Sequence, residues 1–133
     1  MYATAGPSLA LTKYWGKRAG APNLPATPSV AVTLGELRSV TTAEPALPGR
    51  SDRVCINGKE EEAARFVPLF DALRSITGFN GRFEAKSVNN FPTAAGLASS
   101  AGGIAALTKA CDAALGSSLS NEELSSLARL GSG

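Results

Sequence analysis

A run of small residues at positions 92–103 has the composition of a phosphate-binding segment. It reads Pro-Thr-Ala-Ala-Gly-Leu-Ala-Ser-Ser-Ala-Gly-Gly and lies between a predicted strand and the longest predicted helix. Small residues let a backbone approach a ligand closely, and the first turn of a helix presents unpaired N–H groups at the positive end of its dipole. Ser99 and Ser100 add hydroxyl groups that can donate hydrogen bonds or contact a metal ion. The segment predicts an anion site, although the same composition would also serve tight helix packing.

A cluster of cations and aromatic residues at positions 13–18 could hold a multiply charged anion. Its sequence is Lys-Tyr-Trp-Gly-Lys-Arg, and it includes the only tryptophan of the chain. Aromatic bulk beside cations, where a strand runs into a loop, makes a suitable wall for a partly dry anion pocket. Charge runs at strand ends also occur without any function, so this segment by itself does not decide between the two interpretations.

The composition of the 133-residue chain excludes several classes of protein. There is no histidine, which removes Ser-His-Asp triads and most catalytic zinc sites. The net charge of +2 is too small for a general nucleic-acid binder, and no apolar run approaches the roughly 20 residues of a membrane span. Cys55 and Cys111 lie far apart, without the paired spacing of a zinc site or a disulfide framework, so we expect a reduced, cytoplasmic setting.

The elements that must position these segments mix strands and helices irregularly. Composition predicts strands at residues 9–14, 29–34, 39–43, 53–56 and 82–88, and apolar periodicity predicts helices at 60–77 and 97–115. We expect 39–43 to pair with 29–34 and Asn57-Gly58 to form a turn. Pro68 should kink or split the helix around it, and Gly78 should end that helix. Because the regular alternation of a doubly wound sheet is missing, the pattern predicts one α+β domain.

A last helix is predicted from a capping box. The Ser120 hydroxyl can accept a hydrogen bond from the Glu123 amide while the Glu123 side chain reaches back, and an apolar stripe follows at helical spacing from Leu124 to Leu130. Gly131 is expected to end this helix. Because the stripe needs a partner and the chain ends soon after it, we expect these residues to be the front part of a longer polypeptide.

Four segments together carry a resemblance to a known family. They are Lys-Tyr-Trp-Gly-Lys-Arg at 13–18, Asn-Leu-Pro at 23–25, Pro-Ser-Val-Ala-Val-Thr-Leu at 28–34, and Asn-Asn-Phe-Pro-Thr-Ala-Ala-Gly-Leu-Ala-Ser-Ser-Ala at 89–101. In this order and spacing they resemble the diphosphomevalonate decarboxylase family of the GHMP kinase superfamily, over residues 8–133. Ala-Arg-Leu-Gly-Ser-Gly at 128–133 also resembles the start of the family's Gly-Ser-Gly-Ser-Ala-x-Arg-Ser segment, cut in its middle.

The resemblance implies a fold and an activity. The fold is the GHMP-kinase N-terminal domain, a mixed sheet with helices packed on one face that also occurs in ribosomal proteins. Residues 1–133 would form an incomplete ATP- and substrate-binding domain whose C-terminal partner domain is absent from this chain. The implied reaction is ATP-dependent decarboxylation of 5-diphosphomevalonate to isopentenyl diphosphate in the mevalonate pathway, after phosphorylation of the 3-hydroxyl group. ATP and Mg²⁺ are the implied cofactors, and the complete protein is expected to be a homodimer with no nucleic-acid or membrane partner.

The resemblance also implies roles for individual residues. Lys13 would lie near the reacting hydroxyl group and stabilise phosphoryl transfer, which needs cations around the transferring group. The residues implied to bind the substrate are Tyr14, Trp15, Gly16, Lys17, Arg53, Ser132 and Gly133. Those implied to bind ATP are Pro92, Thr93, Ala94, Ala95, Gly96, Leu97, Ala98, Ser99 and Ser100, with Ser99 or Ser100 close to Mg²⁺. If Lys13, Tyr14, Lys17 and Arg53 form one anion pocket, their side-chain ends should converge.

Departures from the family leave alternatives open. Many members carry Asn where this chain has Ser8, and the family's catalytic aspartate and second diphosphate-loop arginine fall outside these residues. We therefore expect the 133 residues alone to be inactive. A phosphomevalonate decarboxylase or another GHMP small-molecule kinase is an alternative enzyme. A non-catalytic module on the same scaffold is the alternative from another class, and it would have no need of two phosphate-binding segments.

Overall fold

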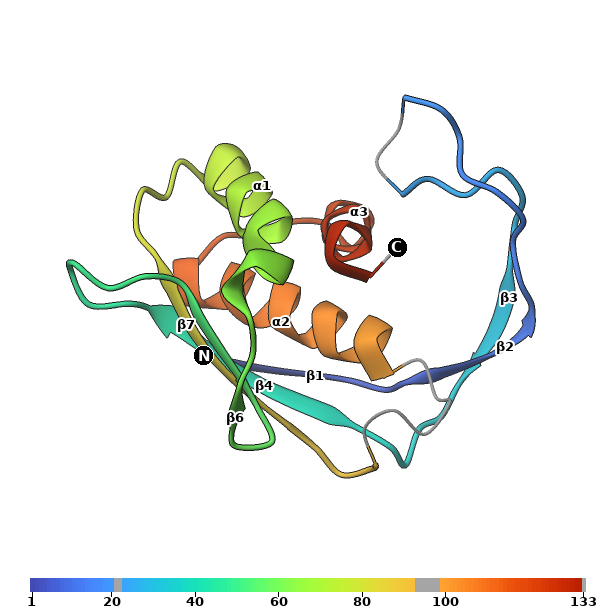
Figure 1. The fold of residues 1–133 in the computed structure, drawn as a ribbon, viewed down its shortest axis with the longest axis horizontal. Helices are drawn as coiled ribbons and strands as arrows, with labels where there is room; N and C mark the ends of the chain where they lie inside the picture. Colours follow the sequence, from blue (N-terminus) through green and yellow to red (C-terminus); the bar gives the residue numbers. More distant parts are fainter. Residues whose placement is uncertain (21–22, 93–98, 133) are drawn as a thin grey trace.

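A mixed five-stranded sheet is the main sheet of the computed structural model, which describes residues 1–20, 23–92 and 99–132 (Figure 1). The strands lie in the order β1 (Tyr2–Ala5), β4 (Ser39–Pro45), β7 (Phe83–Asn89), β5 (Arg53–Ile56) and β6 (Lys59–Glu60). β5 runs parallel to β7, and the other neighbouring strands are antiparallel. This sheet confirms the predicted α+β class.

Buried and exposed residues alternate along the central strands, and this alternation decides which face of the sheet packs against the helices. In β7, Phe83, Ala85 and Ser87 are buried and the residues between them are more exposed, and β4 shows the same period of two. The Phe83 ring stacks on Phe70 with 5.1 Å between the ring centroids. The hydrophobic core therefore lies between one face of the sheet and the helices that cover it.

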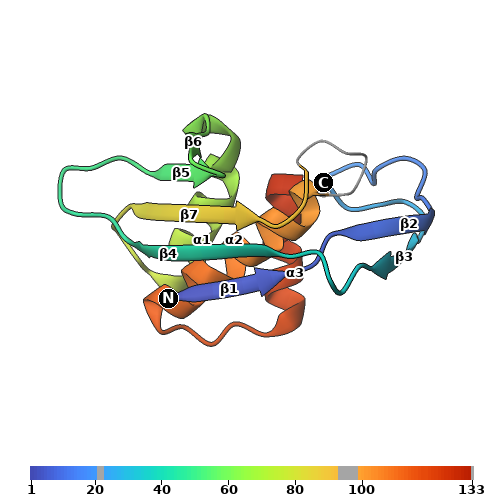
Figure 2. The ribbon, with the colours of Figure 1, turned by 90° about the horizontal axis from the view of Figure 1, so that it is seen from below.

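Helices cover only that face, as predicted (Figure 2). They are the 3-10 helix η1 (Ala63–Phe66) and the α-helices α1 (Val67–Thr77), α2 (Ser99–Leu115) and α3 (Asn121–Ser132). The predicted stripe of α2 is buried at Ile104, Leu107 and Cys111, where α2 crosses β4 and β1. Burial raises the pKa of the Cys111 thiol to about 12, which leaves it inert as a nucleophile. In the part of the chain that the structure describes, no helix is long and apolar enough to cross a membrane.

The expected interruption and end of the first helix are both confirmed. Pro68 lies in the first turn of α1, where its missing N–H removes no helical hydrogen bond, and η1 precedes it as a separate turn. Gly78 caps the helix in the left-handed conformation, with φ of 70° and its N–H donating to the Arg74 carbonyl at 2.9 Å.

The pairing expected between residues 39–43 and 29–34 is wrong. β3 (Val30–Thr33) pairs instead with β2 (Ser8–Thr12) in a separate two-stranded sheet, which extends away from the main sheet (Figure 1). β4 lies between β1 and β7. The error arose because β1 is a four-residue edge strand without a run of β-branched residues, so its composition gave no signal.

The Asn57-Gly58 turn is confirmed, and the hairpin that it forms makes the next helix begin later in the chain than predicted. Both residues have positive φ, 50° and 81°, as a tight hairpin turn requires, and they join β5 to β6. Glu60 was expected to begin a helix but pairs with Cys55 across this hairpin. Helical structure therefore begins only at Ala63.

The capping box at the start of α3 is confirmed, but the predicted end of that helix is wrong. Glu123 Oε2 accepts hydrogen bonds from the backbone N–H and the hydroxyl of Ser120, both at 2.8 Å, and these bonds lower the pKa of Glu123. Gly131 does not stop the helix, which continues to Ser132. A Cβ at Gly131 would lie 3.1 Å from Ile104 Cδ1, so glycine serves close packing of α3 on α2 here.

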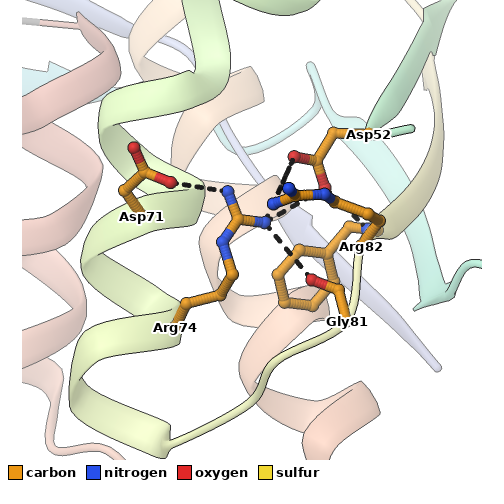
Figure 3. Close-up of polar contacts among 6 residues, drawn as sticks. Asp52, Asp71, Arg74, Gly81 and Arg82 are labelled. Atoms are coloured by element: carbon orange, nitrogen blue, oxygen red, sulfur yellow. Dashed lines mark hydrogen bonds and ion pairs between the residues drawn. The ribbon is translucent and has the colours of Figure 1, made fainter.

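A largely buried ion pair joins α1 to the beginnings of β5 and β7 (Figure 3). Arg74 Nη1 donates to Asp52 Oδ2 at 3.1 Å, and Nη2 donates to Asp71 at 2.7 Å. Asp52 also accepts the Phe83 backbone N–H at 2.8 Å. Burial would lower the pKa of Arg74, but hydrogen bonds and charges from the two aspartates raise it overall. Asp52 therefore has a structural partner at the end of the sheet where β5 and β7 begin.

We expect the Asp52→Ala substitution to lower the free energy of unfolding by about 3 kcal/mol. It would leave a guanidinium that is only 13% exposed and the Phe83 N–H without their shared acceptor. Asp71→Ala is the matched control, because its carboxylate is 63% exposed and its loss should cost less than about 1 kcal/mol. Urea unfolding followed by circular dichroism measures both, and equal losses would contradict this account.

Candidate functional site

The N-terminus of α2 is placed as the sequence predicted for an anion site. Ser99 and Ser100 are its first residues, and the Ser100 side chain is exposed. The helix has 17 residues and no acidic side chain in its first turn, so its dipole and free N–H groups are not opposed there by a negative charge. Pro92 is exposed before this helix, while residues 93–98 and the Ser99 side chain lie outside the described part of the chain.

The position of α2 is fixed by a close backbone approach. A Cβ at Gly102 would lie 3.0 Å from the carbonyl oxygen of Gly6 and 3.2 Å from the nitrogen of Pro7. Gly6 is itself confined, because a Cβ there would lie 2.9 Å from Thr33 Cγ2. The first turns of α2 therefore rest on the β1–β2 junction without intervening side chains.

The C-terminal end of α3 lies beside the N-terminus of α2. The Ser132 hydroxyl is 3.5 Å from the Ser100 hydroxyl, at the limit of a hydrogen bond. Gly131 packs on Ile104 in the same region. The structure thus brings Ser132 and Ser100 together, although the sequence assigned them to different ligands. Gly133 lies outside the described residues.

The cationic segment forms part of a long loop between β2 and β3. Between the described residues of this loop, backbone hydrogen bonds run from Arg18 N–H to the Leu24 carbonyl at 2.8 Å and from Ala26 N–H to the Gly16 carbonyl at 3.1 Å. Tyr14 is half-buried, and the other members of the segment are exposed, namely Lys13, Trp15, Gly16, Lys17 and Arg18. Trp15 is 86% exposed, so its ring is available to a ligand rather than to the core.

Asn23, in the same loop, connects Lys17 to α3. The Lys17 ammonium donates to Asn23 Oδ1 at 2.6 Å, and Asn23 Nδ2 donates to the Arg129 carbonyl at 3.0 Å. Arg129 lies in the last turn of α3, where carbonyl groups have no partner within the helix. Through these contacts and the proximity of Ser132 to Ser100, the end of α3 connects the loop to the start of α2.

A cavity of about 130 Å³ opens beside Ser100, on the face of the sheet that carries the helices. Its wall is largely apolar, with Val54, Phe66, Ile104 and Leu107 among the lining residues, and Arg65 and Glu61 also contribute. Ser87 and Thr41 form a buried hydrogen bond of 2.9 Å in its polar part. Asn89 Oδ1 is buried there without a hydrogen-bond partner among the described residues. No local pattern in the sequence predicts this cavity, because its wall comes from strands and helices far apart in the chain.

Arg53 is not in this site, and the expectation that it converges with Lys17 is wrong. Val54 and Ile56 pack toward the core, so the alternation of β5 directs Arg53 to the opposite face of the sheet. Its guanidinium is 2.7 Å from the Glu60 carboxylate across the β5–β6 hairpin. This hydrogen-bonded ion pair raises the pKa of Arg53 and lowers that of Glu60. Lys17, in contrast, is connected to α3 on the helical face.

Asp112 also belongs to the scaffold. It is 1% exposed and accepts hydrogen bonds from the Ser117 hydroxyl at 2.6 Å, the Lys109 ammonium at 3.1 Å and the Leu119 N–H. Burial alone would raise the pKa of Asp112, but these bonds lower it overall. Over the described residues, no group of three or more histidine, cysteine or acidic side chains could hold a metal ion. A cation at this site would instead need hydroxyl and phosphate oxygens as ligands.

The arrangement is therefore suited to holding anions. Lys17 and the α2 N-terminus supply positive charge, and Ser100 and Ser132 supply hydroxyl groups. Lys13 is exposed where β2 runs into the same loop. The apolar cavity lies beside this polar surface. The roles assigned to Lys13, Tyr14, Trp15, Gly16 and Lys17 stay predictions.

Comparison with known proteins gives consistent matches over almost the whole chain. Residues 5–133 match the model of the diphosphomevalonate decarboxylase-like N-terminal domain. The chain is 38% identical to diphosphomevalonate decarboxylase of Ganoderma lucidum, over 98% of this chain and 37% of that protein. Among solved structures, mevalonate diphosphate decarboxylase of Staphylococcus aureus matches with a TM-score of 0.89 and 38% identity, over 98% of this chain and 40% of that one. The enzyme of Enterococcus faecalis matches with a TM-score of 0.87 and 37% identity, over 98% and 42%.

We expect Gly102→Ala to lower the free energy of unfolding by about 1–3 kcal/mol, because the added methyl group would meet the Gly6 backbone and displace α2. Gly103→Ala is the matched control in the same helical turn. No described atom lies within 4 Å of its added Cβ, so the better helix propensity of alanine should stabilise the protein by up to about 1 kcal/mol. Chemical denaturation of both variants checks this, and stabilisation by Gly102→Ala would contradict the close contact.

Proposed function

This chain belongs to the diphosphomevalonate decarboxylase-like family, and we propose that it forms the ATP- and substrate-binding part of an enzyme that decarboxylates 5-diphosphomevalonate. The chain spans 37% of the length of the Ganoderma lucidum relative and 40% of the Staphylococcus aureus chain. In this proposal residues 1–133 are an incomplete N-terminal domain, and further sequence completes the active site. The product would be isopentenyl diphosphate, formed in the mevalonate pathway of isoprenoid synthesis.

The observation that carries the proposal is a series of contacts that links three chain segments through α3. Ser132, at the end of α3, lies 3.5 Å from Ser100 of α2, and Arg129, three residues earlier, accepts a hydrogen bond from Asn23, which binds Lys17. The reaction needs two anionic ligands side by side, a nucleoside triphosphate and a substrate diphosphate. One helix N-terminus with an adjacent cationic loop offers separate positions for both.

For the nucleotide, we propose that the phosphates lie at the N-terminus of α2 and the nucleoside enters the apolar cavity beside it. The cavity walls of Ile104, Phe66 and Val54 suit a flat apolar ring, and Asn89 Oδ1 offers an acceptor to a base N–H. The E. faecalis structure concerns mevalonate diphosphate mediated ATP binding, and another similar structure is a complex of MDDEF with MVAPP, AMPPCP and magnesium. Mg²⁺ would be held by phosphate oxygens together with the Ser99 or Ser100 hydroxyl.

For the substrate, we propose that Tyr14, Trp15, Gly16, Lys17, Ser132 and Gly133 surround the diphosphate. Lys13 would face the 3-hydroxyl group, where phosphorylation converts a poor leaving group into a good one. Negative charge that develops during phosphoryl transfer is stabilised by a nearby ammonium group. Loss of phosphate and carbon dioxide then forms the double bond.

The proposal is tested with the full-length polypeptide that contains this chain, incubated with ATP, Mg²⁺ and 5-diphosphomevalonate. Release of phosphate and carbon dioxide in equal amounts is the expected result. A parallel reaction with 5-phosphomevalonate identifies the preferred substrate, and a preference for the monophosphate would overturn the assignment. Residues 1–133 alone should bind these ligands without turnover, and release of carbon dioxide by that fragment would place the proton acceptor within it.

We expect the two lysines of the cationic segment to affect different kinetic constants. Lys17→Met removes a ground-state contact with the diphosphate, so the KM for 5-diphosphomevalonate should rise about 10- to 100-fold with a smaller change in kcat. Lys13→Met should mainly lower kcat, because it removes charge that acts during phosphoryl transfer.

Lys86→Met is the matched control, because this lysine is exposed on the face of the sheet away from the helices. Steady-state kinetics with each substrate varied in turn separates the effects. An unchanged KM in Lys17→Met, or an equal change in Lys86→Met, would contradict the assignment.

A further inference from the structure

Asn23 uses both ends of its side-chain amide at once. Oδ1 accepts from the Lys17 ammonium at 2.6 Å, and Nδ2 donates to the Arg129 carbonyl at 3.0 Å. The reverse orientation of the amide would place its NH₂ against an ammonium group and its oxygen against a carbonyl, so the chemistry of the two partners fixes the orientation. A carboxylate in this place could not donate to Arg129, and a hydroxyl group is too short a side chain to contact both partners.

The backbone at Asn23 does not by itself account for this residue. Asn23 has φ of 52°, a conformation in which asparagine is tolerated and glycine is favoured. Glycine would therefore satisfy the turn without any side chain. The two hydrogen bonds are an additional property of asparagine, and both extend from the loop to groups outside the turn.

The location of the ammonium group gives these bonds a functional consequence. Arg129 lies in the last turn of α3, so the carbonyl that Asn23 binds belongs to the negative end of that helix dipole, where a cation such as Lys17 is favoured. The ammonium has three N–H donors, and among the described residues it uses one of them, on Asn23, so the other two can face an anion. Ser132, three residues after Arg129, lies beside Ser100 at the start of α2.

We propose that Asn23 is a positioning residue that holds the Lys17 ammonium at the end of α3, oriented toward the diphosphate of the substrate. Without this contact the flexible lysine side chain would distribute over many rotamers. The entropy lost when an anion orders it would then weaken anion binding. The inference rests on the proposed function, since it deepens the substrate site described there. The experiment distinguishes failure of this inference from failure of the proposed function.

The test is a double-mutant cycle in the full-length protein, comparing wild type, Asn23→Gly, Lys17→Met and the double variant. Glycine keeps the left-handed backbone and removes only the side chain. Inorganic pyrophosphate is the probe for equilibrium binding by calorimetry, and 5-diphosphomevalonate is the probe for kinetics. We expect Asn23→Gly to raise the Kd for pyrophosphate and the KM about three- to tenfold, with kcat within twofold of wild type. In the Lys17→Met background, the same substitution should change neither constant by more than about twofold.

Several outcomes would overturn the inference. Unchanged pyrophosphate binding in Asn23→Gly would do so, and so would an equal effect of this substitution with and without Lys17, which would mean that Asn23 only caps α3. Asn23→Asp is the second variant in case glycine loosens the loop. It keeps the turn but places a negative charge beside the anion, so it should weaken pyrophosphate binding at least as much, and wild-type affinity would overturn the inference. Failure of the wild type to bind pyrophosphate or to turn over would overturn the proposed function itself.

Discussion

The approach of the first turns of α2 to the backbone of Gly6 and Pro7 is the constraint on which the candidate site depends. Because Gly102 has no side chain, the helix lies directly on the β1–β2 junction. A Cβ at Gly102 would be only 3.0 Å from the Gly6 carbonyl oxygen. That contact fixes where the helix dipole points. Gly131 then lets α3 pack on Ile104 of the same helix, and the end of α3 in turn receives the loop through Asn23.

The two sides of the site are held by different kinds of interaction. The α2 side rests on a buried core that includes Ile104, Leu107 and Cys111. The loop side is held by exposed polar contacts, namely the Lys17–Asn23 bond and the backbone bonds across the loop. Exposed polar contacts open at much lower free energy than core packing. The scaffold therefore combines a rigid α2 side with a loop side whose position depends on a few polar contacts, among them the two bonds of the Asn23 side chain.

Local signals in the sequence were sufficient for the presence of the helices and for the position of the α2 N-terminus, but not for the start of the first helix or the end of the last. The capping box at Ser120, the stop at Gly78 and the turn at Asn57-Gly58 are all local chemistry, and the structure confirms each. Strand pairing is not local, so β4 was paired with the wrong partner while the short strand β1 went undetected. Gly131 shows the same limit, because a glycine placed for packing and a glycine placed to end a helix look identical in sequence. The face of the sheet on which Arg53 lies likewise followed only from the register of β5.

The hydrogen-bonded carboxylates in this part of the molecule have structural roles. Asp52 accepts from Arg74 and Phe83, and Asp112 accepts from Ser117, Lys109 and Leu119. The pKa values of Asp112, Glu60 and Glu123 are all lowered by the hydrogen bonds they accept. A carboxylate with a lowered pKa is a weak proton acceptor at neutral pH, so these groups contribute to the fold rather than to proton transfer. The Lys17 ammonium and the hydroxyl groups of Ser100 and Ser132, in contrast, lie around the candidate site. In the proposed reaction this chain therefore binds and orients two anions, and a carboxylate from the rest of the polypeptide accepts the proton of the substrate hydroxyl.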